Sequence, residues 1–156
     1  MVRAIGNGND SALKSQNGFT PARAMQTLPL VRRIVADMIA LSEDIDRHRD
    51  QLRGLDDLTD TIEQTRYQEE VNDIRMTLAD DEARLEKCIA ELAALGIEPH
   101  LPFDGYVDFP ATLNRRPVRL CWHPDDETIS YWHEDGDSAQ QRKRIEDRSF
   151  GSDSFS

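Results

Sequence analysis

Two long stretches of the chain repeat apolar residues in alternating steps of three and four. This spacing is typical of the a and d positions of a coiled coil, where one stripe of each helix contacts a second helix. The two series are Val31, Ile34, Met38, Leu41, Ile45, His48, Leu52 and Leu55, and Val71, Ile74, Leu78, Asp81, Leu85, Cys88, Leu92 and Leu95. The sequence therefore predicts two long helices that pack through these stripes.

A short link containing glycine and aspartate joins the two series, and Gly96 follows the second series as a helix C-cap. We therefore expect an antiparallel coiled-coil helical hairpin over residues 29–96, with its turn near residue 58. In that register His48 and Asp81, the polar members of the stripes, do not meet. Each is expected to fix the helix register or to contact water near a frayed end.

The segment before the hairpin predicts one more short helix. Thr20 can cap a helix that begins at Pro21, and Pro29 marks a kink or a break, after which a new helix begins, because proline removes a backbone hydrogen bond and clashes with the preceding turn. Residues 1–18 and 146–156 are polar and have no periodicity, so we expect disordered tails there. A single domain over residues 19–145 remains.

After Gly96 the apolar period changes from 3.6 to 2. The segments GYVDFP, RPVRLCW and TISYWHE predict a three-stranded antiparallel β-meander within residues 105–134, and the fold class is therefore α+β. A four-residue loop, PDDE, pairs His123 with Thr128 in the predicted register. One face of the sheet then carries Val118, Leu120, Trp122, Ile129, Tyr131 and His133.

Charge and hydropathy exclude two classes of partner. The net charge is -11, and residues 56–96 hold twelve acidic and four basic residues, so a phosphate backbone is repelled and we expect no nucleic acid. No apolar run reaches the roughly 20 residues that span a bilayer, and the N-terminus lacks the apolar centre of a signal peptide. We expect a cytoplasmic protein with no membrane partner. Cys88 and Cys121 are not in a metal-type spacing and are expected to be buried free thiols.

One loose group of polar residues is a candidate site. His133, Asp108 and Glu134 offer imidazole nitrogen and carboxylate oxygen, which are ordinary ligands of zinc or iron, and Asp126 lies nearby in the sequence. Arg142 and Trp132 would complete a small-ligand site with His133. The alternative is structural: His133 is bonded to Asp108 or to a backbone carbonyl and holds the sheet on the helices.

A second candidate lies on the opposite face of the predicted sheet. Cys121 and His123 alternate along one strand, with Ser130 opposite Cys121. Two ligands from one strand need two more, and neither Cys88 nor His100 has a spacing that supplies them.

Three blocks of the sequence together resemble a known family. FTPARAMQTLPLVRRIV, GYVDFPA and LCWHPDDETISYWHE are similar to the signature blocks of the small prokaryotic proteins named domain of unknown function 2203. The residues that match the family pattern of the last block are Leu120, Cys121, Trp122, Ile129, Trp132, His133 and Arg142, with Asp126 at a glutamate position. The departures from it are Thr128, Ser138-Ala139 and Gln141. The resemblance implies a fold and no reaction.

No catalytic or nucleotide-binding motif is present: the chain has no glycine-rich phosphate loop, no GxSxG, no HExxH and no zinc-finger spacing. We therefore expect a non-enzymatic interaction or scaffold protein without a cofactor, which self-associates as a homodimer through its helices or binds another protein. The competing class is a metal- or small-ligand-binding protein, conceivably an enzyme, with a divalent metal at the junction of helices and sheet.

Overall fold

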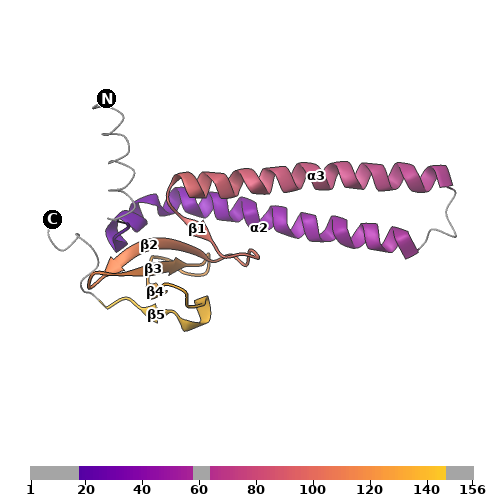
Figure 1. The fold of residues 1–156 in the computed structure, drawn as a ribbon. Coiled ribbons are helices and arrows are strands. Elements are labelled where there is room, and N and C mark those ends of the chain that lie inside the picture. Colours follow the sequence, from indigo (N-terminus) through magenta and orange to yellow (C-terminus); the bar gives the residue numbers. More distant parts are fainter. Residues whose placement is uncertain (1–17, 58–63, 147–156) are drawn as a thin grey trace, which may run out of the picture.

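The computed structural model of the protein describes residues 18–57 and 64–146 (Figure 1). Two long helices, α2 (Pro21–Asp57) and α3 (Gln64–Ala94), precede an antiparallel sheet, so the α+β prediction is confirmed. Residues 1–17 and 147–156 of the expected tails, and the expected turn near residue 58, lie outside the described residues. Within the described ranges no helix is long and apolar enough to cross a membrane.

Helix α2 is continuous over 37 residues and contains Pro29. The prediction of a separate short helix before residue 29 was therefore wrong. Proline removes one hydrogen bond of the helix, but its neighbours Leu28 and Val31 are both buried in the core. Their burial on either side of Pro29 holds the helical path where the local sequence alone favours a break.

Helices α2 and α3 lie side by side, run in opposite directions and extend beyond the sheet (Figure 1). The expectation that His48 and Asp81 do not meet was wrong: His48 Nδ1 lies 3.5 Å from Asp81 Oδ2. A turn centred at residue 58 would pair His48 with residues 67–71. The helix ends are instead Asp57 and Gln64, and α3 begins beyond the end of α2, which shifts the partners along α3.

The sheet has five antiparallel strands in sequence order, not three. They are β1 (Glu98–Pro99), β2 (Val107–Leu113), β3 (Arg116–Trp122), β4 (Tyr131–Glu134) and β5 (Lys143–Arg144). Strand β3 coincides with the predicted segment RPVRLCW. The predicted meander over residues 105–134 missed β1 and β5, because strands of two residues are too short to show an alternating pattern.

The predicted register between the last two long strands was wrong by one residue. Leu120 pairs with Trp132 and Cys121 with Tyr131, and Arg119 pairs with His133. The loop between β3 and β4 is longer than PDDE, and Ile129 enters the core from this loop and not from a strand. Because side chains alternate along a strand, the slip moves His133 away from the face of Leu120 and onto the face of Cys121.

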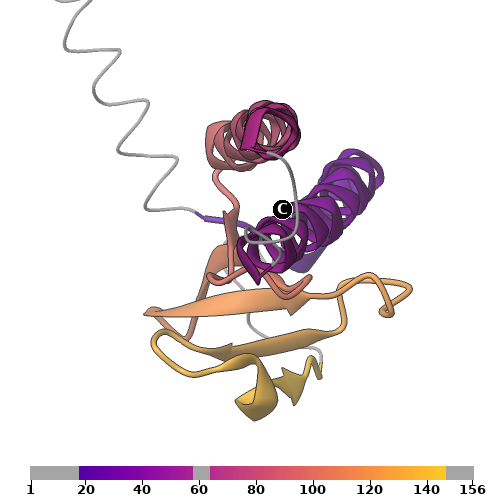
Figure 2. The same ribbon diagram turned by 90° about the vertical axis from the view of Figure 1, so that its right-hand side faces the viewer.

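One face of β2 and β3 packs on the helices, and both helices lie on the same side of the sheet (Figure 2). The core cluster joins α2 residues with the inward side chains of the strands. Its members from β2 and β3 are Val107, Phe109, Ala111, Leu113, Val118, Leu120 and Trp122. The other face of these strands is left for polar residues.

Candidate functional site

Four residues that can bind metal come together on the polar face of the sheet. His100, Asp108, Cys121 and His133 each point one potential ligand atom inward, and these atoms all lie within 4.8 Å of one another. We call them the polar cluster. Cys121, His133 and Asp108 are 0%, 1% and 6% exposed, and His100 is half-buried. So many buried polar atoms need partners, because an unpaired buried polar group costs free energy.

The register of the sheet places each member of the polar cluster. Asp108 on β2 pairs directly with Cys121 on β3, so the two side chains share a face. His133 on β4 pairs with Arg119, two residues from Cys121, and therefore projects to that face as well. His100 comes directly after β1. One residue is thus contributed by, or follows, each of four neighbouring strands.

Both imidazoles point their Nε2 atoms at the same carboxylate oxygen. Oδ1 of Asp108 lies 3.1 Å from His133 Nε2 and 2.9 Å from His100 Nε2. The second distance would suit a hydrogen bond but its angles do not, and Nε2 of His100 makes no hydrogen bond to any described residue. The ring centroids of the two histidines are 5.9 Å apart and nearly perpendicular.

Both ring nitrogens of His133 face acceptor oxygens. Nδ1 is 2.8 Å from the backbone carbonyl oxygen of Glu134. Nε2 lies 3.1 Å from Asp108 Oδ1, and a carbonyl and a carboxylate oxygen both only accept. A neutral imidazole has one N–H, so in the neutral form one of these two contacts sets two acceptors against each other. A second proton on the ring, or a cation between Nε2 and Oδ1, removes this conflict.

Burial raises the pKa of the Cys121 thiol to about 12, and the Asp108 carboxylate beside it acts in the same direction. The guanidinium of Arg142 opposes this shift. With no cation in the polar cluster, Cys121 is therefore a neutral thiol at pH 7. A bound transition metal would reverse this, since a thiol that coordinates such an ion is deprotonated.

Two arginines flank the polar cluster, and both are held by carboxylates. Arg119 Nη1 is 4.0 Å from Asp108 Oδ2 and 2.6 Å from Glu98 Oε1, and its Nε donates to Asp135. Arg142 donates to both carboxylate oxygens of Asp126, at 2.7 and 3.3 Å. These pairs fix positive charge on two sides of the cluster.

Aromatic rings hold Arg142 on the face of Cys121. Its guanidinium lies 4.1 Å from the ring centroid of Tyr131 and 5.2 Å from that of Tyr106. The Tyr106 ring in turn lies 4.5 Å from the ring of His123. Arg142 Nη1 also lies 3.5 Å from the backbone oxygen of Cys121.

The residues predicted for a ligand site separate into two groups. The structure brings His133 and Asp108 into contact and places Arg142 next to Cys121. Glu134 and Trp132 project to the opposite face: the carboxylate of Glu134 accepts two hydrogen bonds from Arg116, and Trp132 packs against the core cluster. A three-residue metal site with Glu134, and a ligand site that combines His133 with Trp132, are therefore not assembled.

The second candidate site is also divided. Cys121 belongs to the polar cluster, whereas Nδ1 of His123 accepts a hydrogen bond from the backbone of Asp125. The loop at Gly105 packs closely against His123. A Cβ atom added at Gly105 would lie only 2.9 Å from Nε2 of His123.

His100 was not predicted to belong to this site. Its only signal in the sequence was its place in the segment EPH, between the end of the second predicted helix and the first clearly predicted strand.

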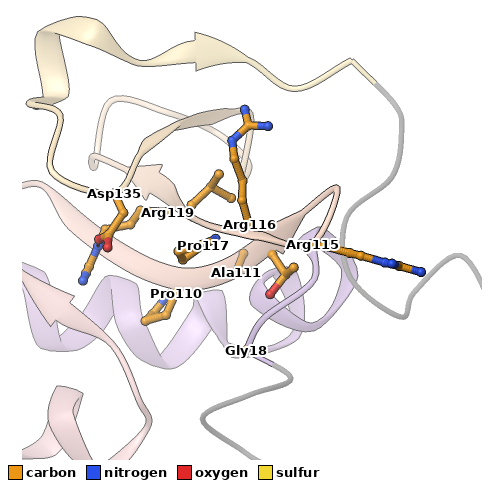
Figure 3. A pocket seen from close by; sticks show the side chains of 10 residues that line it. Gly18, Pro110, Ala111, Arg115, Arg116, Pro117, Arg119 and Asp135 are labelled. Atoms are coloured by element: carbon orange, nitrogen blue, oxygen red, sulfur yellow. Dashed lines mark hydrogen bonds and ion pairs between the residues drawn. The ribbon is translucent and has the colours of Figure 1, made fainter.

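A cleft of 230 Å³ near Gly18 is lined by three arginines. Figure 3 shows Arg115 and Arg116 pointing in different directions, away from a common centre. Arg116 is paired with Glu134 and Arg119 with Glu98 and Asp135. The arginines do not converge, so this cleft lacks the geometry of an anion site.

Comparison with known proteins agrees with the resemblance found in the sequence. No curated protein and no solved structure matches the chain. The sequence model of the family described as "Uncharacterized conserved protein (DUF2203)" matches residues 17–145, which is most of the chain. The protein therefore belongs to the DUF2203 family.

Proposed function

We propose that the protein binds one divalent transition-metal ion through His100, Asp108, Cys121 and His133. The observation that carries this proposal is that both ring nitrogens of His133 face acceptor oxygens, with Nε2 3.1 Å from Asp108 Oδ1 and Nδ1 2.8 Å from the Glu134 carbonyl oxygen. His100 Nε2 points at the same Asp108 oxygen without a hydrogen bond to any described residue. One cation between the two Nε2 atoms and Oδ1 would satisfy all of them.

The contact between His133 Nδ1 and the Glu134 carbonyl supports the same proposal. Histidines that bind metal usually donate their other ring N–H to a carbonyl or carboxylate, which fixes the tautomer and the orientation of the ring. His133 has this arrangement, with Nδ1 2.8 Å from the carbonyl oxygen. Its Nε2 is thus prepared to donate its lone pair to an ion.

The mixture of ligand atoms favours zinc, or ferrous iron or cobalt, over calcium and magnesium. Two imidazole nitrogens and a thiolate suit borderline and soft ions, whereas calcium and magnesium take oxygen ligands. Ligand atoms around a tetrahedral zinc ion are about 3.5 Å apart. The four atoms of the polar cluster lie within 4.8 Å of one another, and Asp108 Oδ1 is 2.9 and 3.1 Å from the two Nε2 atoms, so the shell would form if the close pairs moved apart slightly and the distant ones moved inward.

Four protein ligands are the number found in structural zinc sites, while catalytic sites keep one position open. The proposed role is therefore to bind an ion that fastens β1, β2, β3 and β4 together. Cys88 and Cys121 are both free thiols, which supports placing the protein in a reducing compartment such as the cytoplasm.

The competing arrangement is a buried ion pair between protonated His133 and Asp108. It satisfies one of the two imidazoles but leaves Nε2 of His100 without a hydrogen bond to any described residue. The two arrangements differ in one observable property, which is the saturable uptake of metal.

Cobalt(II) titration of chelator-treated protein purified without an affinity tag tests the proposal. We expect saturation at one ion per chain, with visible bands typical of tetrahedral cobalt and a near-ultraviolet thiolate-to-cobalt band. Cys121→Ser should remove the thiolate band, and His100→Asn should weaken binding. His123→Gln and Cys88→Ser, which change residues of the same types outside the cluster, should leave the titration unchanged. Failure to saturate, or equal binding by the cluster variants, would overturn the proposal.

A further inference from the structure

We infer that the protein forms a homodimer in which the groove between α2 and α3 packs against the same groove of a second copy. In this arrangement α2 of each copy lies against α3 of the other. The inference does not depend on metal binding, because the groove is lined by residues of the two helices alone. It assigns a surface to the self-association that the helical pattern led us to expect.

The α2 edge of the groove is acidic with a small apolar centre. Asp37, Ala40, Leu41 and Asp44 line it, and their spacing of three, four and seven residues puts them on one face of the helix. Ala40 is exposed and Leu41 is half-buried. A small residue between two carboxylates lets another helix approach closely, and packed helices have axes about 8–10 Å apart.

The α3 edge repeats this spacing with an excess of basic charge, because it holds two basic residues and one acidic residue. Arg84, Lys87, Cys88 and Glu91 follow one another at the same intervals, so they also share one face. Cys88, half-buried like Leu41, lies at the centre of this edge. The groove between the two edges has a volume of 460 Å³.

Two-fold symmetry makes these edges complementary. A surface that meets its own copy across a two-fold axis can place its acidic edge against the partner's basic edge twice. Charged side chains of the groove form ion pairs within the chain, and they could exchange these for ion pairs with the second copy. Asp44 lies 2.8 Å from Arg47, and Arg84 lies 4.0 Å from Asp81. The Asp44 and Arg84 side chains are 42% and 72% exposed, and ion pairs at such exposure contribute little.

Charge exchange between two variants tests the pairing of α2 with α3. The first variant is Asp37→Lys/Asp44→Lys, which makes both edges basic. The second is Arg84→Glu/Lys87→Glu, which makes both edges acidic. We expect the wild-type protein to be a dimer in the micromolar range and each variant to need a roughly 100-fold higher concentration to dimerise. An equimolar mixture should form a heterodimer, because each acidic edge then meets a basic one.

Mass must be measured by native mass spectrometry or light scattering, since an elongated monomer imitates a dimer in gel filtration. Circular dichroism of each variant at the same concentration establishes that both are folded. The control is Asp46→Lys/Glu86→Lys, which changes net charge as the first variant does. At about 100° per residue these positions lie opposite the groove stripes, and the control should remain dimeric. A wild-type monomer at all concentrations, variants that stay dimeric or a mixture that stays monomeric would overturn the inference; the first result would leave a different protein as the occupant.

Discussion

Asp81 and His48 face each other between the two long helices, with the carboxylate Oδ2 3.5 Å from the imidazole Nδ1. Asp81 is buried, and His48 Nδ1 makes no hydrogen bond to any described residue. The pair interrupts two apolar stripes at the same level of the hairpin. Each residue therefore gives the other a polar partner, which lowers the free-energy cost of burying it.

We predict that Asp81→Leu lowers the free energy of unfolding by about 1 to 3 kcal/mol, because it leaves the imidazole buried without its acidic partner. The double variant His48→Leu/Asp81→Leu should recover most of this loss, since both polar groups are then replaced together. Urea unfolding of the four members of this double-mutant cycle gives the coupling energy. Additive effects would mean that the two side chains do not interact.

Core truncation should distinguish the base of the hairpin from its middle. Met38 is fully buried against the sheet, whereas Leu78 is only half-buried. Met38→Ala should cost about 2 to 5 kcal/mol, and Leu78→Ala should cost less, about 1 to 2 kcal/mol. Denaturant unfolding with a common m-value checks the order. A larger loss for Leu78→Ala than for Met38→Ala would contradict this order of burial.

Replacing two of the glycines by alanine should change the stability of the protein in opposite directions. Gly18 has φ of +63°, and a Cβ atom there would lie 2.7 Å from the Pro110 carbonyl oxygen, so Gly18→Ala should cost about 2 to 3 kcal/mol. Gly54 lies within α2 and a Cβ atom there meets nothing within 4 Å. Gly54→Ala should stabilise the protein by about 0.5 to 1 kcal/mol. Thermal unfolding of the two variants at equal concentration measures both effects.

Zinc should raise the thermal stability of chelator-treated protein. At a free concentration 100 times the dissociation constant, an ion that binds only the folded state adds about 3 kcal/mol. His133→Gln should remove this increase. Trp132→Phe should keep it, because Trp132 lies on the opposite face of the sheet from the polar cluster. Equal zinc stabilisation of His133→Gln and wild type would place the ion elsewhere.

Cys121 should make stability depend on alkaline pH when metal is removed. Its pKa in the folded protein, about 12, is above the ordinary value of 9.0, so the unfolded chain loses the thiol proton first. The contribution of Cys121 is therefore fully present below pH 9 and is lost as pH rises from 9 towards 12. The difference in unfolding free energy between wild type and Cys121→Ala isolates it from other groups. A constant difference across this range would contradict the raised pKa.

The local pattern of the sequence predicted the helices and the central strand well. The buried residues of α2 include Val31, Ile34, Met38 and Ile45, all members of the predicted stripe. The helical period is repeated many times, and β3 alternates over seven residues, so both signals outweigh local exceptions. Pro29 is such an exception, because packing of its neighbours overrides its own preference.

The polar cluster depended on information that local pattern does not contain. The face of His133 is set by its pairing with Arg119, and a one-residue difference in loop length reverses it. The position of His100 depends on the pairing of β1, where Pro99 lies opposite Val107. Both are relations between distant segments. The chemistry of Asp108 and His133 marks them as candidates in the sequence, whereas the position of Cys121 beside them depends on the fold.

The hairpin extends beyond the sheet, so a small tilt of the helices at their base produces a larger displacement at their far end. From Met38, the last α2 residue in the core cluster, to the end of α2 at Asp57 the helix continues for about 30 Å at 1.5 Å per residue. A tilt of roughly 5° at the base would therefore displace the tip by about 2 to 3 Å. Contacts between the arms, such as Arg49 with Glu82 at 2.7 Å, make the two helices move together. Small changes where α3 enters β1 would thus be amplified into displacements at the far end of the molecule.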